Sequence, residues 1–185
     1  MELYLPLLEN LIVSVDSLET VPEMHELISK LKIRWTSSMT TSTILPKFFQ
    51  IDKMNFELAM TLFLYGVVLR DRAFEVLVED LTQSCNFLRR SAGVYNYLAS
   101  AILPPLLSKL SADKPPEVFA ATCTAWSLIC LAEAQSVTIT KAEENKGSLG
   151  LLSKLHVDVA KMLDEASEAL EPKSGRCKDI SSHFL

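Results

Sequence analysis

Trp126-Ser-Leu-Ile-Cys-Leu-Ala-Glu133-Ala-Gln135 is an apolar run that also contains small residues, one carboxylate and one amide. It continues to Lys141-Ala142, and a Lys-Gly-Ser turn at residues 146–148 separates it from Leu151-Leu152-Ser-Lys154-Leu155. This pattern predicts two helices, at residues 117–145 and 149–170, whose short connection makes them an antiparallel hairpin. We expect Glu133 and Gln135 to form hydrogen bonds across a helix pair, because an unpaired buried polar group costs about 1–3 kcal/mol.

Apolar residues recur at three- and four-residue spacing elsewhere in the chain, whereas alternation of the strand type does not persist. Further helices are expected at residues 2–18, 23–33, 54–69 (or to 71) and 73–110, the last one kinked at Pro104-Pro105. The Ser/Thr-rich segment 34–46 is interpreted as a loop held by Trp35. In the first helix Leu3, Leu7, Leu11 and Val15 form a stripe with i, i+4 spacing. The fold class is therefore all-α, an irregular helical solenoid with tetratricopeptide-like antiparallel helix hairpins.

The composition narrows the class of protein. The chain has 185 residues, 49% of them hydrophobic and 22% charged, with a net charge of −5 and no basic block, so we expect no nucleic-acid partner. The uncharged runs at residues 58–69 and 118–132 fall short of the roughly 18 residues that span a bilayer. No signal-peptide pattern precedes them, which favours a cytoplasmic location. The cysteines lack C-x-x-C spacing and are interpreted as reduced, buried thiols: Cys85, Cys123, Cys130 and Cys177.

Catalytic chemistry is not indicated. The three histidines, His25, His156 and His183, lie in separate segments, and no nucleotide-binding, metalloprotease or hydrolase motif occurs. His156 is expected to be a structural residue at the edge of an apolar stripe formed by Leu149, Leu152, Val159, Met162 or Leu163, and Ala166. We therefore expect no cofactor, no metal site and no enzymatic activity.

Several segments together resemble the BRO1 domain. They are Ser91-Ala-Gly-Val-Tyr-Asn-Tyr-Leu98, Pro116-Glu-Val118, Leu128-Ile-Cys-Leu-Ala-Glu-Ala-Gln135, Lys141-Ala142 and Leu152-Ser-Lys-Leu155. Their order and spacing match the small-residue helix, the helix cap, the Ala-Gln helix and the Lys-Leu helix start of that family. Trp35 followed by Phe56-Glu57 is similar to the family's tryptophan loop and Phe-Glu helix. The resemblance covers about residues 30–170 and points to a divergent, plant-type member.

The resemblance implies a function. BRO1 domains are boomerang-shaped helical solenoids that act as non-enzymatic scaffolds of endosomal sorting. The resemblance therefore implies an adaptor in multivesicular body protein sorting that binds the C-terminal amphipathic helix of an ESCRT-III subunit. Such an adaptor would be cytoplasmic and peripheral on endosomes. The family's apolar patch would fall on Thr138, Leu151 and Leu155. Thr138 stands where the family places a large aromatic residue, and Leu151 and Leu155 are interpreted either as an exposed ledge or as ordinary core.

The domain organisation follows from the same resemblance. We expect residues 1–172 to form a partial BRO1-like helical domain and residues 173–185 a loosely ordered tail. Since a full BRO1 domain is much longer, the first and last helices are expected to expose apolar faces. The alternative function is a truncated structural solenoid that has lost the ESCRT-III site and associates with other proteins through its helices.

Overall fold

The computed structural model describes residues 2–18, 21–37, 39–40, 47–51, 53–107, 110 and 113–171, apart from the side chains of Met24, His25 and Ser29. The chain is almost entirely helical, and the predicted tail at residues 173–185 lies outside the described residues. The elements are α1 (Tyr4–Ser17), α2 (Pro22–Ser29), β1 (Arg34–Thr36), β2 (Phe48–Gln50), α3 (Met54–Val76), α4 (Leu81–Tyr97), a π-helix (Leu98–Ile102), α5 (Leu103–Leu107), a 3-10 turn (Pro116–Val118), α6 (Ala120–Glu144) and α7 (Leu149–Leu170).

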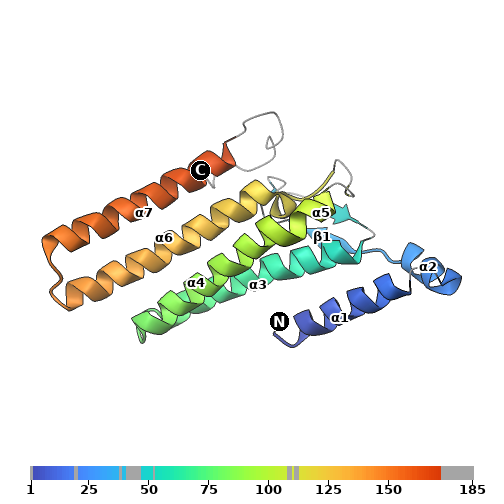
Figure 1. Ribbon diagram of the computed structural model, residues 1–185, viewed down its shortest axis with the longest axis horizontal. Helices are drawn as coiled ribbons and strands as arrows, with labels where there is room; N and C mark the ends of the chain where they lie inside the picture. The colour runs from blue at the N-terminus through green and yellow to red at the C-terminus, as the bar shows by residue number, and fades with distance from the viewer. Residues whose placement is uncertain are drawn as a thin grey trace.

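The long helices form a row in the order α1, α3, α4, α6 and α7 (Figure 1). Helices α3 and α4 are joined by a short turn and pack against each other, as do α6 and α7, while α4 packs against α6 between the two hairpins. The predicted solenoid of antiparallel hairpins is thus confirmed. Helix α6 lies in the middle layer, with a helix on each side.

The turn between α3 and α4 corrects the sequence prediction. Helix α3 runs on to Val76 and α4 begins only at Leu81, whereas a break was expected near residue 72. The charged run around Arg70 does not end the helix, because Ala73 and Val76 beyond it are buried. Instead Asp80 caps α4, accepting hydrogen bonds from the backbone N–H groups of residues 82 and 83 at 2.8 and 3.0 Å.

A small antiparallel sheet replaces part of the predicted loop. Strand β1 pairs with β2 so that Trp35 lies opposite Phe49, which is almost fully buried. Helix α2 therefore ends at Ser29 and not at residue 33, since the chain must extend before it enters β1. Trp35 does hold this segment as predicted, because its Nε1 donates a 2.7 Å hydrogen bond to Glu57 Oε2 on α3.

The predicted single helix at residues 73–110 is in fact several elements. After α4 the chain adopts the wider π-helical turn and then the short α5, which contains Pro104 and Pro105. Proline lacks the N–H group that a regular helix needs, so a local change of hydrogen-bonding pattern before it is expected. Among the described residues, no helix combines the length and apolar character needed to cross a membrane.

The buried face of α1 also differs from the prediction. Leu5, Leu8 and Ile12 are buried and join the main core cluster, while Leu3, Leu7 and Leu11 of the predicted stripe face outward and Val15 is half-buried. Both sets have helical spacing, and their roles depend on how α1 is rotated against α3. The expectation that the first helix exposes an apolar face is confirmed.

Candidate functional site

An ion pair fixes α6 against α3. Arg70 Nε donates to both carboxylate oxygens of Glu133, at 3.1 and 2.8 Å, and its Nη2 also contacts Oε1. The guanidinium lies 5.5 Å from the centre of the Trp126 ring and 4.9 Å from that of Phe74. The hydrogen bond with Glu133 is the main reason why the pKa of Arg70 is raised. Glu133 therefore makes the cross-helix bond that the sequence predicted, and it is not available as a catalytic carboxylate. The half-buried Gln135 makes no side-chain hydrogen bond within the described residues, so that part of the prediction was wrong.

Small residues bring α3, α4 and α6 into close contact. Ser91 Oγ donates to the Gly66 carbonyl at 2.7 Å and lies 3.4 Å from Cys130 Sγ. A Cβ at Gly66 would lie 2.7–3.0 Å from the ring of Tyr95, which is fully buried. These contacts make α3, α4 and α6 one platform; from the Ser-Ala-Gly segment they involve Ser91 and Ala92, whereas Gly93 has open space around it.

A groove of about 170 Å³ runs between α4 and α6, near the end of α6 that leads into α7. Thr138 lies in it, where its Oγ1 donates to the Ala134 carbonyl at 2.9 Å and is 3.8 Å from Cys85 Sγ. The small hydroxyl side chain leaves the groove open at the position where the family resemblance predicts an aromatic ring. The lining residues are Leu81, Thr82, Cys85, Asn86, Arg89, Val137, Thr138 and Lys141.

The groove is basic. Arg89 comes from α4 and Lys141 from α6, and Lys141 Nζ donates to Thr82 Oγ1 at 2.5 Å. The sequence of α4 contains no Asp or Glu, and within the described part of the chain neither cation has a recorded carboxylate partner. By contrast, Arg90 points to the other side of α4 and pairs with Glu2 at 3.0 Å. The groove can therefore take an acidic side chain.

Helix α7 lies across the other face of α6. Its Ser148 cap accepts a hydrogen bond from the backbone N–H of Leu151, whose side chain is 47% exposed. Leu155 is half-buried and belongs to the stripe of partly or fully buried residues that faces α6: Leu152, Leu155, Val159, Met162 and Ala166. The predicted stripe was thus partly wrong, because Leu149 is 85% exposed and His156 is exposed as well.

The three predicted partner-binding residues are only partly brought together. Thr138 lies on the α4 side of α6, in a groove whose lining contains no residue of α7. Leu151 is exposed near the start of α7, and Leu155 contributes mainly to the hairpin seam. Sequence reasoning identified neither Arg89 nor Lys141 as part of a groove. The absence of acidic residues from α4 was the signal that could have identified this basic rim.

The two buried thiols stay protonated at physiological pH. Burial raises the pKa of Cys123 to about 12, and that of Cys130 to about 11 although its hydrogen-bonding contact with Ser91 opposes the shift. Both cysteines are free and neutral at physiological pH, as predicted, whereas Cys85 is only half-buried and Cys177 lies outside the described residues. In the part of the chain that the structure describes, no group of His, Cys, Asp or Glu residues is placed to hold a metal ion.

Comparison with known proteins identifies a matching domain family and several similar proteins. The BRO1-like domain family matches residues 16–184. Mouse BRO1 domain-containing protein BROX is 28% identical over 173 residues, which are 91% of this chain and 40% of BROX. ALG-2 interacting protein X of Dictyostelium discoideum is 30% identical over 170 residues, which are 85% of this chain and 21% of that protein. The chain thus spans less than half the length of these relatives.

Two solved structures have the same fold. One is ALIX in complex with the SIVmac239 PYKEVTEDL late domain, with a TM-score of 0.69 and 21% identity over 95% of this chain and 25% of that chain. The other is an ALIX BRO1–CHMP4C complex, with a TM-score of 0.68 and 21% identity over 94% of this chain and 49% of that chain. At this level of identity the similarity describes the fold.

Proposed function

The chain belongs to the BRO1-like domain family, and from this membership we propose that it is a non-enzymatic adaptor of endosomal sorting that binds the C-terminal amphipathic helix of an ESCRT-III subunit. In this proposal it is cytoplasmic and associates peripherally with endosomes. The observation that carries it is the open groove at Thr138, which lies between two helices fixed by buried contacts. A groove between two helices suits the helix-in-groove mode of recognition.

A structural relative supports the choice of partner. One of the ALIX structures with the same fold contains CHMP4C bound to the BRO1 domain. We take the equivalent partner for this chain to be a helix that lies along α6, with one apolar side chain in the Thr138 groove and another against Leu151. Leu155 supports this surface from within the α6–α7 seam.

The groove also defines which partner helix would bind well. Because Thr138 replaces an aromatic anchor, the apolar contact is smaller than the family resemblance predicts, and aromatic anchors contribute strongly to such interfaces. Arg89 and Lys141 offer a compensating interaction, since a carboxylate between two cations gains charge-assisted hydrogen bonds. A partner helix with an acidic residue beside its apolar anchors is therefore preferred.

Binding of a fluorescent peptide that represents the C-terminal helix of CHMP4C tests the proposal. The wild-type chain should bind with a micromolar Kd, and Leu151→Asp should weaken binding at least tenfold because it places a charge on the exposed ledge. Leu149→Asp is the matched control, since Leu149 lies on the same helix and is even more exposed. Arg89→Glu should weaken binding and remove part of its salt dependence.

The results distinguish the proposal from its rival. If folded wild-type protein does not bind the peptide, the chain is better described as a structural solenoid that lacks the ESCRT-III site. If Leu149→Asp weakens binding as much as Leu151→Asp, the peptide binds α7 without using the proposed ledge. Circular dichroism of each variant shows whether a loss of binding reflects a loss of fold.

A further inference from the structure

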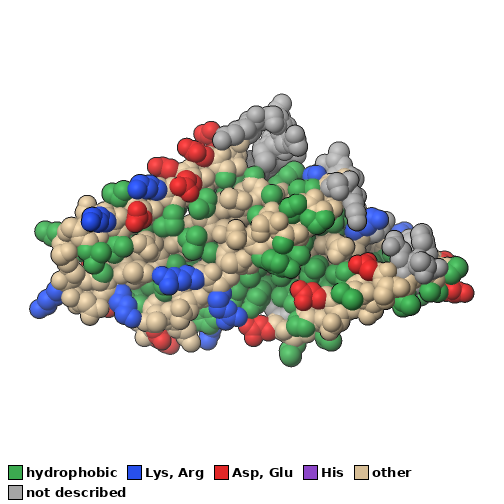
Figure 2. Space-filling view, in the orientation of Figure 1, with side chains coloured by type: hydrophobic (Ala, Val, Ile, Leu, Met, Phe, Trp, Pro, Cys, Tyr) green, Lys and Arg blue, Asp and Glu red, His purple; other side chains and the backbone are tan. Residues whose placement is uncertain are grey.

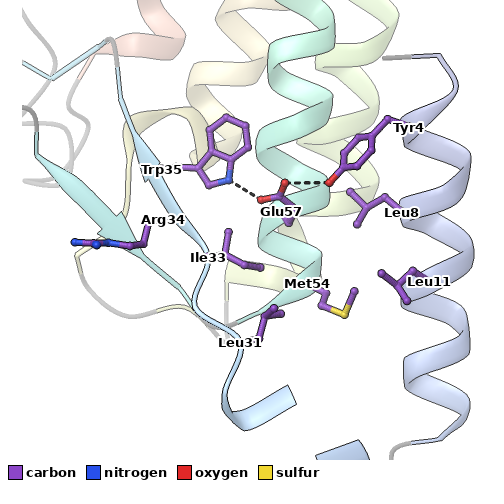
Figure 3. A pocket seen from close by; sticks show the side chains of 9 residues that line it. All are labelled: Tyr4, Leu8, Leu11, Leu31, Ile33, Arg34, Trp35, Met54 and Glu57. Carbon is purple, nitrogen blue, oxygen red and sulfur yellow. Dashed lines mark hydrogen bonds between the residues drawn. The ribbon is translucent and has the colours of Figure 1, made fainter. Parts of the chain in front are cut away.

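A second and larger pocket, of about 530 Å³, opens at the α1 end of the helix row. Three segments that are distant in sequence form its walls: α1, residues 31–35 and the first turn of α3 (Figure 3). Aliphatic side chains converge on it from all three, and two aromatic rings close its upper end. The lining residues are Tyr4, Leu8, Leu11, Leu31, Ile33, Arg34, Trp35, Met54 and Glu57.

The pocket has one polar centre. Glu57 accepts the Trp35 indole N–H at 2.7 Å on Oε2 and the Tyr4 hydroxyl at 3.3 Å on Oε1. A carboxylate has about four lone-pair sites, so Glu57 can accept further donors from a ligand. Arg34 does not neutralise it, because its guanidinium turns away from the pocket and stacks 5.1 Å from the centre of the Phe48 ring (Figure 3).

The apolar surface extends out of the pocket along α1. Leu11 belongs to the pocket wall and is 51% exposed, and it continues the i, i+4 stripe of Leu7 and Leu3, which are 67% and 87% exposed. Figure 2 shows hydrophobic side chains gathered where α1 meets the body of the molecule. The outermost layer of a helical solenoid normally presents a polar face to water. The stripe is thus placed to contact an apolar partner.

The charge around this surface selects the partner. Six acidic residues and no basic residue precede Lys30, and even with Lys30, Lys32 and Arg34, which flank or line the pocket, residues 2–35 carry a net charge of −3, compared with −2 for the rest of the chain. Within α1 and α2 these acids are Glu9, Asp16, Glu23 and Glu26. A second copy of the chain docked through the same helices would bring like charges together, and anionic lipid would be repelled for the same reason.

We propose that the Glu57 pocket and the α1 stripe form a docking site for a basic amphipathic helix of another protein. An apolar side chain of the partner fills the pocket, its neighbours at i+3 and i+4 cover Leu7 and Leu11, and flanking Lys or Arg residues face Glu57 and the acidic α1–α2 region. This site is separate from the Thr138 groove, so it stands whether or not an ESCRT-III helix binds there.

The test uses a synthetic helical peptide of Leu and Lys in amphipathic order, with a Leu and Glu peptide of the same pattern as its counterpart. The readout is the indole N–H signal in NMR spectra, because the chain has only two tryptophans and Trp126 packs against Arg70 and does not line the pocket. The Leu/Lys peptide should shift the Trp35 signal with a Kd in the micromolar range and leave Trp126 in place. The Leu/Glu peptide should bind at least tenfold more weakly.

Two variants locate the site. Leu11→Ser should weaken binding of the Leu/Lys peptide about tenfold, because it removes an exposed part of the pocket wall. Leu163→Ser, at a leucine of similar exposure on α7, should leave the Kd unchanged. The proposal is overturned if the two variants behave alike, if both peptides bind equally well, or if the peptide shifts Trp126 and not Trp35. If the wild type forms a dimer on a sizing column and Leu11→Ser abolishes the dimer, the surface binds a second copy of the chain. If the wild type binds neutral phosphatidylcholine vesicles and Leu11→Ser abolishes that binding, the surface binds lipid.

Discussion

On the side that faces α4, helix α6 is joined to its neighbours by specific polar contacts, including Ser127 Oγ to the Ala92 carbonyl at 3.0 Å and the Arg70–Glu133 ion pair. On the side that faces α7, the described residues show an apolar seam and no recorded side-chain hydrogen bond between the two helices. Acidic side chains gather along the outer face of α7 (Figure 2). Directional contacts thus fix the platform, while α7 remains a partly exposed helix whose side chains can meet a partner.

The largest difference between the two sides should appear on truncation of a leucine. Leu88 is fully buried with Ala134 and Val137 between α4 and α6, so Leu88→Ala should lower the free energy of unfolding by about 2–5 kcal/mol. Leu152→Ala, in the half-buried α7 seam, should cost about half as much. Urea unfolding of the two variants measures both values. Equal losses would contradict the distinction between the two faces of α6.

Alkaline pH tests the platform of α3, α4 and α6 without testing α7, because the buried cysteines lie in the platform and α7 contains no cysteine. The folded state raises the pKa of Cys123 to about 12 and of Cys130 to about 11, from an ordinary value of 9.0. The contribution of the two protonated thiols to the stability of the fold is therefore fully present below pH 9. It is lost as pH rises, because the thiols of the unfolded chain release their protons at a lower pH than those of the folded chain. At pH 10 the loss should be about 1 kcal/mol per thiol.

Unfolding in urea at pH 8 and pH 10 gives the measurement for these thiols. The double variant Cys123→Ala/Cys130→Ala is the control, and its stability should fall less steeply than that of the wild type over this interval. Identical pH dependence of the two proteins would mean that the thiols are not protected from ionisation by the fold.

A matched pair of glycines tests the close approach of α3 and α4. Gly66→Ala places a methyl group within 3.0 Å of the buried Tyr95 ring and should cost about 1–3 kcal/mol. Gly93→Ala meets no atom within 4 Å and should instead stabilise α4 by about 0.5–1 kcal/mol. Thermal unfolding followed by circular dichroism distinguishes them. A destabilising effect of Gly93→Ala comparable to that of Gly66→Ala would show that helix packing at Gly66 is not the cause.

The smallest loss of stability is expected at the cap of α7. Ser148 accepts a hydrogen bond from the Leu151 N–H, so Ser148→Ala should cost about 1 kcal/mol. Hydrogen exchange should become faster in the first turn of α7 and stay unchanged in α4, whose own cap is Asp80. Faster exchange across α4 as well would show that α7 is not a separate outer layer.

Much of this arrangement was readable from the sequence because local patterns determine it. The small residues around Ser91 and the polar groups around Glu133 predicted close, hydrogen-bonded helix pairs, and the Lys-Gly-Ser turn predicted the α6–α7 hairpin. The Gly147 N–H bonds the Ala142 carbonyl at 2.8 Å, and Lys146 adopts a positive φ of 56°.

Other features depend on contacts that no local pattern shows. Three-residue strands are too short for alternation to be recognised, so the Trp35–Phe49 pairing was missed. The rotation of a helix is set by its neighbours, which is why Leu155 turned toward α6 while Leu151 remained exposed, and why the stripe of Leu3 and Leu7 faces outward. The basic character of α4 could be read from its sequence, but the groove beside Arg89 could be recognised only once both α4 and α6 were placed.

An NMR titration of methyl-labelled protein with the C-terminal helix of CHMP4C tests the central proposal most directly, because the groove and the α1 pocket lie at different ends of the molecule. The Thr138 and Leu151 methyl signals should shift together with one micromolar Kd, while those of Leu7 and Leu11 stay in place. Shifts confined to Leu7 and Leu11, or no shift at Thr138 and Leu151 in folded protein, would contradict the assignment of the α4–α6 groove as the ESCRT-III docking site.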